Sequence, residues 1–257
     1  MAVNRHQNGV MAWILDLDGV LWLSDERIPG SAEAVERLRA RGDRVLFVSN
    51  NSSARVDEYL AKLERVGVPT ESADLVTSGQ AAATLLESGQ TALVCAGPGV
   101  EEALEARDVR TVRSGKADAV VVGWHRDFDY EGLTRAAQTV MDGARLIGTN
   151  DDATYPTPEG LIPGGGAILA AVATAAGVDP TVAGKPHAPM VDLVRTRLCP
   201  DLTGSTVVGD RPSTDGRLAL ALGARFALVL SGVTKERDLP VDPQPAEVAP
   251  DLASLVR

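Results

Sequence analysis

Residues 11–18 read MAWILDLD, a short and nearly continuous apolar run that ends in acidic residues. Such a run is typical of a strand that is buried on both faces of a parallel sheet. A helical pattern capped by Ser31 follows over residues 31–42, and residues 44–50 (RVLFVSN) again have the pattern of a buried strand. A second helix is expected over residues 54–67. This alternation predicts right-handed crossovers and a doubly wound, parallel α/β sheet.

The same alternation continues toward the carboxyl end. Further strands are expected within residues 73–78, 91–97, 117–124, 145–150, 205–210 and 224–232, and further helices within 100–107, 130–143, 167–177, 190–198 and 213–223. Residues 151–166 are rich in Pro, Gly and Asp, and we expect a long loop there of the kind that often carries function. The tail, residues 233–257, is polar and contains one short apolar helix at its end.

The composition excludes several classes of partner. The chain has 257 residues and a formal net charge of −10, which argues against nucleic acid and against anionic membrane surfaces. No apolar stretch has the length of a membrane span, and residues 1–13 lack the pattern of a secretory signal, so we expect a cytoplasmic protein. Cys95 and Cys199 lie in apolar surroundings and are expected to be small core residues.

Two carboxylates follow the first strand. Asp16 and Asp18 are two residues apart and precede Gly19, so both can approach one point, one as a nucleophile and the other as a proton donor. The alternative is an acidic turn, because Asp-Gly is a common turn pair. In an open α/β sheet, ligands bind at the carboxyl ends of the strands, where these residues stand.

Other chemistry-bearing residues stand at comparable positions. Ser49 and Asn50 end the second strand and can hold phosphate oxygens, or simply cap a helix. Lys185 precedes a helix and is a cation that can offset clustered acids, although a lone lysine is usually solvated. Asp210 and Asp215 follow a buried strand, and crowded carboxylates are unfavourable unless a cation joins them. Hard oxygen ligands favour Mg²⁺.

Taken together, these motifs resemble the haloacid dehalogenase superfamily, and within it the C2-capped, NagD-like branch (class IIA) of p-nitrophenyl phosphatase type. The resemblance covers roughly residues 11–232. It is carried by the motif order acid-x-acid, strand-Ser, Lys and GDxxxTD, and by the stretches DLDGVLW, FVSNNS, TYPTPEGLIPGGG and AGKP. It implies a haloacid-dehalogenase-like Rossmannoid core, residues 1–79 and 181–257, with an inserted α/β cap domain, residues 80–180.

The resemblance also implies roles for the acidic residues. Asp16 is the nucleophile that forms an aspartyl-phosphate, and Asp18 protonates the leaving alcohol and then activates water. Mg²⁺ is bound by the Asp16 carboxylate, the Asp18 backbone carbonyl and Asp210. Asp215 orients the lysine or a metal-bound water. The implied activity is a Mg²⁺-dependent phosphoric monoester hydrolase that acts on small phosphorylated metabolites of the sugar, glycerol or glycolate phosphate type.

The remaining implied roles concern phosphate and specificity. Ser49 and Asn50 hold the phosphoryl group, and Lys185 neutralises its charge. In the cap, His125 and Arg126 can meet a polar or anionic part of the substrate, and the alternative is that they belong to a solvated loop. The segment 150–154 is a second candidate for specificity, and His187 is a substrate-side group or a surface group.

Two further activities stay open at this point. The GDRPSTDG motif, residues 209–216, has Ser213 where the branch commonly has an acid and Gly216 where it has an apolar residue, and its effect on metal affinity is open. This departure leaves room for a non-catalytic protein that binds a phosphorylated ligand, and transfer to an acceptor other than water is a third activity. Dehalogenases of the superfamily lack the second acid, so Asp18 favours phosphate esters. The sequence names neither the substrate nor the oligomeric state, and the resemblance allows a homodimer through the caps.

Overall fold

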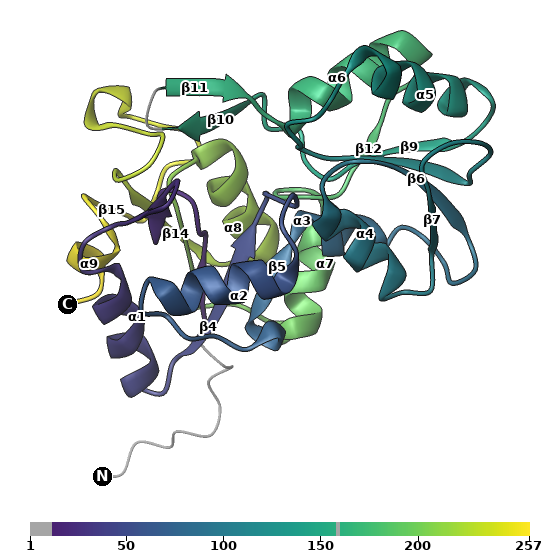
Figure 1. Ribbon diagram of the computed structural model, residues 1–257. Helices are drawn as coiled ribbons and strands as arrows, with labels where there is room; N and C mark the ends of the chain where they lie inside the picture. Colours follow the sequence, from purple (N-terminus) through teal and green to yellow (C-terminus); the bar gives the residue numbers. More distant parts are fainter. Residues whose placement is uncertain (1–11, 158–159) are drawn as a thin grey trace. The chain divides into compact units, whose positions relative to one another are not determined.

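The computed structural model describes residues 12–157 and 160–257, which divide into two compact units (Figure 1). The first unit comprises the described residues up to Val48, Leu63–Leu75 and Val191–Arg257. The second unit comprises Ser49–Lys62 and the described residues of Val76–Met190. Each unit is built around its own sheet.

The first unit contains most of a six-stranded sheet with the order β15-β14-β13-β1-β4-β5. Its strands are β1 (Ala12–Leu15), β4 (Arg44–Ser49), β5 (Leu75–Thr77), β13 (Thr206–Gly209), β14 (Arg225–Val229) and β15 (Glu247–Ala249). Strand β1 pairs in parallel with both β13 and β4, with Leu15 opposite Val208 on one side and Phe47 on the other. Strands β13, β14 and β15 are also parallel to one another.

The strand order reverses at β1, because β4 and β5 extend from one side of it and β13, β14 and β15 from the other. The carboxyl ends of β1 and β13 therefore lie side by side at the position where open α/β sheets bind ligands. The expected doubly wound α/β fold is confirmed. Strand β1 is buried because its flanking strands and the packed helices cover it, and Ile14 and Leu15 have no exposed surface.

The helices associated with this sheet begin and end close to the expected residues. They are α1 (Ser31–Ala40), α2 (Val56–Arg65), α7 (Ala188–Arg197), α8 (Arg217–Leu222) and α9 (Leu252–Leu255), with short 3-10 turns at Ser72–Asp74 and Glu236–Asp238. The expected capping role of Ser31 is wrong. Gly30 stands at the N-cap in a left-handed conformation, and the Ser31 hydroxyl instead donates to the Leu21 carbonyl.

The second unit contains a five-stranded sheet with the order β12-β9-β8-β6-β7. Its strands are β6 (Thr91–Cys95), β7 (Arg110–Val112), β8 (Ala119–Val122), β9 (Arg145–Gly148) and β12 (Thr181–Val182), and its helices are α3 (Ser78–Ala83), α4 (Pro98–Glu105), α5 (Tyr130–Met141) and α6 (Gly165–Ala176). Helices α5 and α6 cover one face of this sheet, and α4 lies on the other (Figure 1). The core between the sheet and α5 and α6 includes Leu93, Val120, Val140, Leu169 and Val172.

The segment expected to be a long loop, residues 151–166, contains a β-hairpin. Strands β10 (Thr154–Thr157) and β11 (Gly160–Pro163) pair in antiparallel, with Tyr155 opposite Ile162. Proline removes ladder donors, which is why this composition looks like a loop in the sequence, but short hairpins tolerate it. A second small hairpin, β2 (Trp22–Leu23) with β3 (Glu26–Arg27), follows β1 and was also not expected.

The two cysteines differ from each other. Cys95 is buried, as expected, and burial raises the pKa of its thiol to about 11. The expectation of a core position is wrong for Cys199, which is only partly buried and whose Sγ donates to the Asp201 carbonyl at 2.9 Å. Among the described residues, no helix is long and apolar enough to cross a membrane.

Candidate active site

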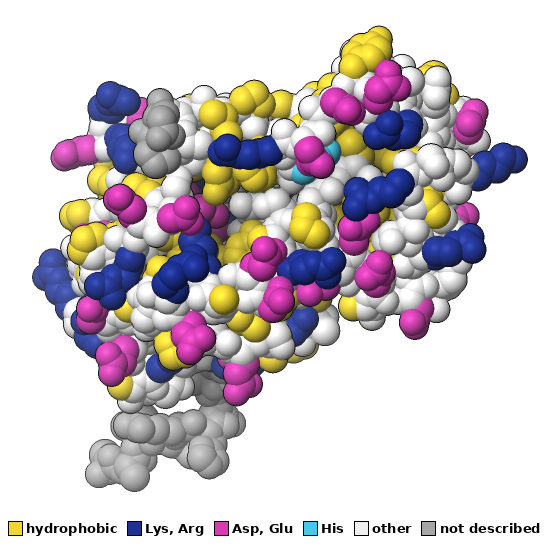
Figure 2. Space-filling view, in the orientation of Figure 1, with side chains coloured by type: hydrophobic (Ala, Val, Ile, Leu, Met, Phe, Trp, Pro, Cys, Tyr) yellow, Lys and Arg dark blue, Asp and Glu magenta, His cyan; other side chains and the backbone are white. Residues whose placement is uncertain are grey.

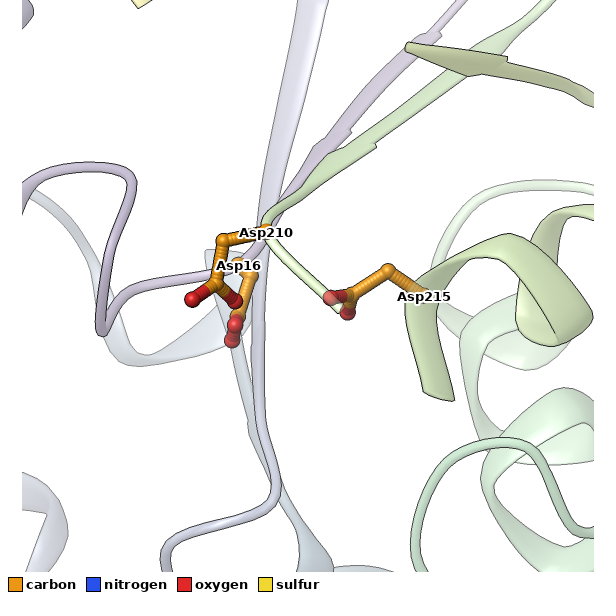
Figure 3. Close-up of side chains that lie close together, drawn as sticks. All are labelled: Asp16, Asp210 and Asp215. Atoms are coloured by element: carbon orange, nitrogen blue, oxygen red, sulfur yellow. The ribbon is translucent and has the colours of Figure 1, made fainter. Parts of the chain in front are cut away.

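Three carboxylates meet at the carboxyl ends of β1 and β13. Asp16 follows β1 directly, Asp210 follows β13, and Asp215 lies in the turn that leads into α8 (Figure 3). One carboxylate oxygen of each residue lies within 4.8 Å of the others. Asp210 and Asp215 are 2% and 1% exposed, whereas Asp16 is partly exposed. The sequence prediction that Asp16 and Asp210 converge is therefore confirmed, and Asp215 joins them.

Glycines make the space for this cluster. A Cβ atom on Gly19 would lie 2.5 Å from Asp210 Oδ2, and a Cβ on Gly232 would clash with the same carboxylate. A Cβ on Gly209 would clash with the carboxylate of Asp215. The backbone therefore approaches two of the three acids as closely as atoms allow, and any side chain at these glycines would displace them.

Backbone N–H groups hold two of the carboxylates in place. The Val233 N–H donates to Asp210 Oδ2, and the Arg211 N–H donates to Asp215 Oδ2 at 3.1 Å. Residues 212–216 form a π-helical turn, whose wider backbone brings Asp215 back toward the end of β13. No side chain caps this turn by a hydrogen bond, so Asp215 is not simply part of a capped helix start.

The chemistry of this donor set fits a divalent cation. Three carboxylates at this separation repel one another when they are ionised, and two of them are almost inaccessible to water. Carboxylate oxygens are hard ligands of the kind that Mg²⁺ prefers, and Mg²⁺ needs only one or two carboxylates with water and substrate oxygens. Among the residues that the structure describes, this is the group whose ligand atoms could hold a metal ion.

Asp18 stands on a tight turn beside the cluster and is held separately. The Trp22 indole donates to Asp18 Oδ1 at 3.0 Å, and Gly19 has a φ of +84°, which favours glycine. The Gly19 carbonyl accepts a hydrogen bond from the Ser231 hydroxyl at 2.6 Å. Trp22 therefore orients one carboxyl oxygen of Asp18, and Ser231 holds the turn. The sequence Asp16–Gly19 alone does not predict the hydrogen bond from Trp22 or the one from Ser231.

Ser49, Asn50 and Lys185 belong to the second unit, where Asn50 and Lys185 lie together. Ser49 is the last residue of β4, is 1% exposed, and accepts a hydrogen bond from the Asn51 N–H at 3.1 Å. Accepting this bond leaves the Ser49 hydroxyl hydrogen able to donate. Lys185 is 2% exposed, so the expectation that a lone lysine is usually a solvated surface charge does not apply to it.

Asn50 contacts Lys185 through its side-chain amide. Asn50 Oδ1 accepts from the Lys185 N–H at 2.7 Å, and Asn50 Nδ2 donates to the Lys185 carbonyl at 3.2 Å. The same Nδ2 donates to Asp152 Oδ2 at 2.9 Å. The Asn50 carbonyl accepts from Ser78 Oγ and from Asn150 Nδ2, both at 2.6 Å. The segment 150–154, a sequence candidate for specificity, therefore contacts Asn50.

The predicted specificity residues His125 and Arg126 point to different surroundings. His125 Nδ1 lies 3.0 Å from the Gly123 carbonyl, and its ring makes an edge contact with Phe128. His125 also lines a cavity of about 160 Å³ within the second unit. The Arg126 guanidinium lies over the Trp124 ring, 5.8 Å from its centroid.

His187 is hydrogen-bonded to Asp151 within the second unit. Its Nε2 lies 3.0 Å from Asp151 Oδ2, and both side chains are partly exposed. The hydrogen bond from His187 lowers the pKa of the Asp151 carboxyl below its ordinary value. His187 therefore connects the segment after β12 to the segment after β9.

Comparison with known proteins identifies relatives along almost the whole chain. A family model described as haloacid dehalogenase-like hydrolase matches residues 13–110, and one described as HAD-hydrolase-like matches residues 182–255. A D-glycerol 3-phosphate phosphatase from Mycobacterium tuberculosis is 35% identical over 94% of this chain and 70% of its own length. An acid sugar phosphatase from Staphylococcus saprophyticus is 31% identical over 89% of each chain.

The solved structures agree with the sequence relatives. A glycerol phosphate phosphatase from Mycobacterium tuberculosis in complex with magnesium superimposes with a TM-score of 0.86 and 34% identity. The superposition covers 96% of this chain and 76% of that one. The likeness therefore extends to both units of the chain.

Proposed function

Because the chain belongs to the haloacid dehalogenase-like hydrolases, we propose that it is a Mg²⁺-dependent phosphatase that hydrolyses small phosphorylated metabolites through an aspartyl-phosphate on Asp16. The observation that carries the proposal is the cluster of Asp16, Asp210 and Asp215 at the ends of two adjacent parallel strands. The relatives are named D-glycerol 3-phosphate phosphatase and acid sugar phosphatase, which supports a phosphorylated polyol or sugar as the substrate.

The metal site is assigned to residues of the first unit. Asp16 and Asp210 would bind Mg²⁺ through their carboxylates and Asp18 through its backbone carbonyl, with Asp215 beside them. When bound, the ion supplies positive charge that offsets the carboxylates and the phosphoryl oxygens. Because Asp210 and Asp215 are buried, bulk water does not screen their charges, so a bound cation is needed to offset them.

The two acids that follow β1 divide the chemistry between them. An Asp16 carboxylate oxygen attacks phosphorus, the bond from phosphorus to the ester oxygen breaks, and Asp18 gives its proton to the departing alkoxide. Asp18, now a base, takes a proton from water, and that water attacks phosphorus and releases Asp16 and inorganic phosphate. The hydrogen bond from Trp22 to Asp18 Oδ1 supports this assignment, because it orients the carboxyl group that must move the proton.

Phosphate binding is assigned to Ser49, Asn50 and Lys185. Ser49 ends β4, the strand that pairs with β1, and its hydroxyl can donate to a phosphoryl oxygen. The side-chain amide of Asn50 is engaged by Lys185 and Asp152, so its contribution to the phosphate would come from its backbone N–H. Lys185 would supply positive charge against the phosphoryl group, since phosphoryl transfer depends mainly on positioning and charge stabilisation.

The specificity elements are assigned to a cap over residues 80–180. His125 and Arg126 would meet the part of the substrate beyond the phosphate. The proposal predicts that alanine at either residue changes KM for individual substrates more than it changes kcat for p-nitrophenyl phosphate.

The decisive experiment measures release of inorganic phosphate from p-nitrophenyl phosphate and from a panel of sugar and polyol phosphates. Wild type with Mg²⁺ is expected to turn over, and EDTA is expected to abolish turnover. The Asp16→Asn variant is expected to lose at least about 10³-fold in kcat, because an amide is a far weaker nucleophile than a carboxylate. Activity that survives both EDTA and Asp16→Asn would rule out the proposal.

The same assay separates the other activities. A protein that only binds phosphorylated ligands would show ligand-induced shifts in Tm without phosphate release from any member of the panel. A phosphotransferase would give new phosphate esters when alcohols are added to the reaction.

Two properties of the whole protein are also proposed. A homodimer through the caps predicts twice the chain mass of 26.9 kDa by light scattering. A cytoplasmic location predicts recovery in the cytosolic fraction of cells that express the tagged chain.

A further inference from the structure

Asn50 is placed to control the position of Lys185, and four observations point in this direction. The first is that its side-chain amide bonds both the N–H and the carbonyl of Lys185, at 2.7 and 3.2 Å. Two hydrogen bonds to the same residue fix the orientation of its peptide groups, and therefore the direction in which its Cα–Cβ bond leaves the backbone. A single hydrogen bond would leave a rotation free.

The second observation is that Asp152 sets the orientation of the amide. An ionised carboxylate only accepts hydrogen bonds, so the end of the Asn50 side chain that faces Asp152 Oδ2 at 2.9 Å must be the nitrogen. This assignment directs Oδ1 to the Lys185 N–H and gives both Nδ2 hydrogens an acceptor. A flipped amide would place its oxygen against two acceptors.

The third observation concerns Gly184, the residue before Lys185. A Cβ atom there would lie 2.6 Å from Asn50 Oδ1 and 2.5 Å from the Thr149 carbonyl. The chain reaches the amide only because this position lacks a side chain. The close approach therefore depends on two residue types: a glycine at position 184 and an asparagine at position 50.

The fourth observation is that Asn50 is itself fixed. Its carbonyl accepts from Ser78 Oγ and Asn150 Nδ2, and its side chain is largely buried. Lys185 is 2% exposed, so its long side chain has few alternative paths once its backbone is set. An immobile anchor joined to a buried lysine leaves the ammonium group little freedom of position.

We propose that Asn50 is a positioning residue: its side-chain amide fixes the backbone of Lys185 and so sets where the lysine ammonium meets the phosphoryl group. This inference rests on the phosphate-binding role proposed above for Lys185. It assigns the Asn50 side chain to the lysine, with Asp152 as the residue that orients the amide, and it leaves the Asn50 backbone N–H to the phosphate.

The test is a double-mutant cycle, because a residue that acts through Lys185 should have no effect when Lys185 is absent. Asn50→Leu is nearly isosteric and removes all three side-chain hydrogen bonds. In the wild-type background it is expected to lower kcat about tenfold or more with a smaller change in KM. In the Lys185→Met background the same change is expected to lower kcat less than about twofold.

Thr149→Val provides a matched control. Thr149 is buried and accepts a hydrogen bond from Ser52 Oγ at 3.0 Å, so this isosteric change removes a buried bond between the two segments that also carry the Asn50–Asp152 bond, and it removes neither bond to Lys185. It is expected to lower Tm as Asn50→Leu does, and to leave kcat within about twofold of wild type. If Thr149→Val lowers kcat as much as Asn50→Leu, the effect is only structural and the inference is wrong.

A second readout does not depend on turnover. The affinity of each Mg²⁺-loaded variant for inorganic phosphate, measured by calorimetry, should fall on Asn50→Leu in the wild-type background and change little in the Lys185→Met background. Equal losses in both backgrounds, or no loss in either, would overturn the inference. A wild type that binds phosphate but hydrolyses nothing would refute the proposed function while leaving this cycle readable.

Asn50→Leu can prevent folding, so a gentler exchange is included. The double variant Asn50→Asp/Asp152→Asn keeps an acceptor for the Lys185 N–H and a donor-acceptor pair between the two side chains, and it replaces the donor to the Lys185 carbonyl with a carboxylate oxygen. The inference predicts a loss of kcat that is again suppressed by Lys185→Met. Wild-type kcat in this exchange would show that the carbonyl contact does not position the lysine.

Discussion

At the scale of single residues, Gly232 limits what can stand beside Asp210. Its Cα approaches the carboxylate so closely that a methyl group there must displace the acid or the backbone. Close packing against a fixed group is costly to change, because overpacking strains the neighbours by about 1–3 kcal/mol. The glycine therefore helps to set the position of the Asp210 carboxylate in the cluster.

We predict that Gly232→Ala weakens Mg²⁺ binding at least tenfold and lowers kcat in parallel, because the added Cβ displaces a ligand. Calorimetric titration with Mg²⁺ measures the first effect and steady-state kinetics the second. Gly79→Ala is the control, since a Cβ there meets its nearest neighbour, the Ser52 Cβ, at 3.3 Å and stands in helix α3, where alanine is favoured over glycine. Unchanged Mg²⁺ affinity in Gly232→Ala would contradict the assigned site.

The Asp151–His187 pair gives a prediction with a definite pH window. The folded state lowers the pKa of Asp151 from 3.8, chiefly through the hydrogen bond from His187. The contribution of the Asp151 carboxylate to the free energy of unfolding is therefore fully present above pH 3.8. It is lost as the pH falls through the lower pKa of the folded state. Carboxyl NMR should show Asp151 titrating below 3.8 in wild type and closer to 3.8 in His187→Ala. Identical titration of the two proteins would contradict the assignment.

Some of these residues were accessible from the sequence and others were not. Asp16 and Asp210 stand directly after buried apolar runs, so the strand pattern places them. Trp22 lies in the stretch DLDGVLW, but its hydrogen bond to Asp18 could not be deduced from that stretch, and Gly232 contacts a residue 22 positions away. The burial of Lys185 likewise depends on the tertiary packing around it.

At the scale of elements, the departure in the GDRPSTDG motif has a packing explanation. A Cβ at Gly216 would lie 2.7 Å from Pro243 Cγ and 3.0 Å from Phe226 Cε1, so the space that an apolar side chain would take is already filled. Ser213 is exposed, whereas Asp215 is buried. Ser213 therefore faces solvent and Gly216 packs against Pro243 and Phe226, while Asp210 and Asp215 are both part of the carboxylate cluster.

The β10–β11 hairpin is attached to the loop after β8 by one aromatic residue. The Trp124 ring stacks on the Tyr155 ring, with 4.9 Å between the ring centroids, and Trp124 Nε1 donates to the Pro163 carbonyl at 3.1 Å. An aromatic pair of this kind contributes about 0.5–1.5 kcal/mol beyond its buried area. A two-stranded hairpin is marginal alone, so it depends on contacts such as this one and on the packing of α6 against both of its strands.

We predict that Trp124→Leu increases hydrogen exchange at the β10–β11 amides while the β8 amides keep their protection. Trp124→Phe separates the two contacts, because it keeps a stacking ring and removes the hydrogen bond to Pro163. Its exchange rates should fall between those of wild type and Trp124→Leu. Equal exchange of the hairpin amides in all three proteins would show that the stack does not order it.

The long strands and helices were predictable because each repeats its apolar pattern over enough residues. Strands β7, β12 and β15 were not, since they have only three, two and three residues and are defined by the neighbours that they pair with. The hairpin at 154–163 was hidden by its prolines. The sequence thus predicts those elements that are long enough to show an apolar periodicity. The short strands form only because tertiary contacts pair them with a neighbouring strand.

At the scale of the whole molecule, the acid cluster opposes folding when no cation is present. Three carboxylates within 4.8 Å of one another repel one another. A destabilising arrangement of this kind is expected at a functional site. Binding of Mg²⁺ to the folded chain alone stabilises it by mass action, about 2.7 kcal/mol at 100 times Kd. On the face seen in Figure 2, by contrast, acidic and basic side chains are interspersed.

We predict that Mg²⁺ raises the Tm of wild type in a concentration-dependent manner and that Asp210→Asn loses this shift. In EDTA, Asp210→Asn is expected to melt at or above the temperature of wild type, because it removes one of the repelling charges while retaining an acceptor for the Val233 N–H. Differential scanning calorimetry with Mg²⁺ and with EDTA measures both. A marked loss of Tm in EDTA would mean that the charge itself stabilises the fold.

The difference between the two cysteines makes the native chain selectively taggable. The thiol of Cys95, which is buried in the second unit and has a pKa of about 11, should not react with a maleimide at neutral pH. Cys199 lies partly open to solvent. A dye would thus mark one position in the folded protein and two after denaturation. Counting labels by mass spectrometry would follow opening of the Cys95 core without any engineered probe.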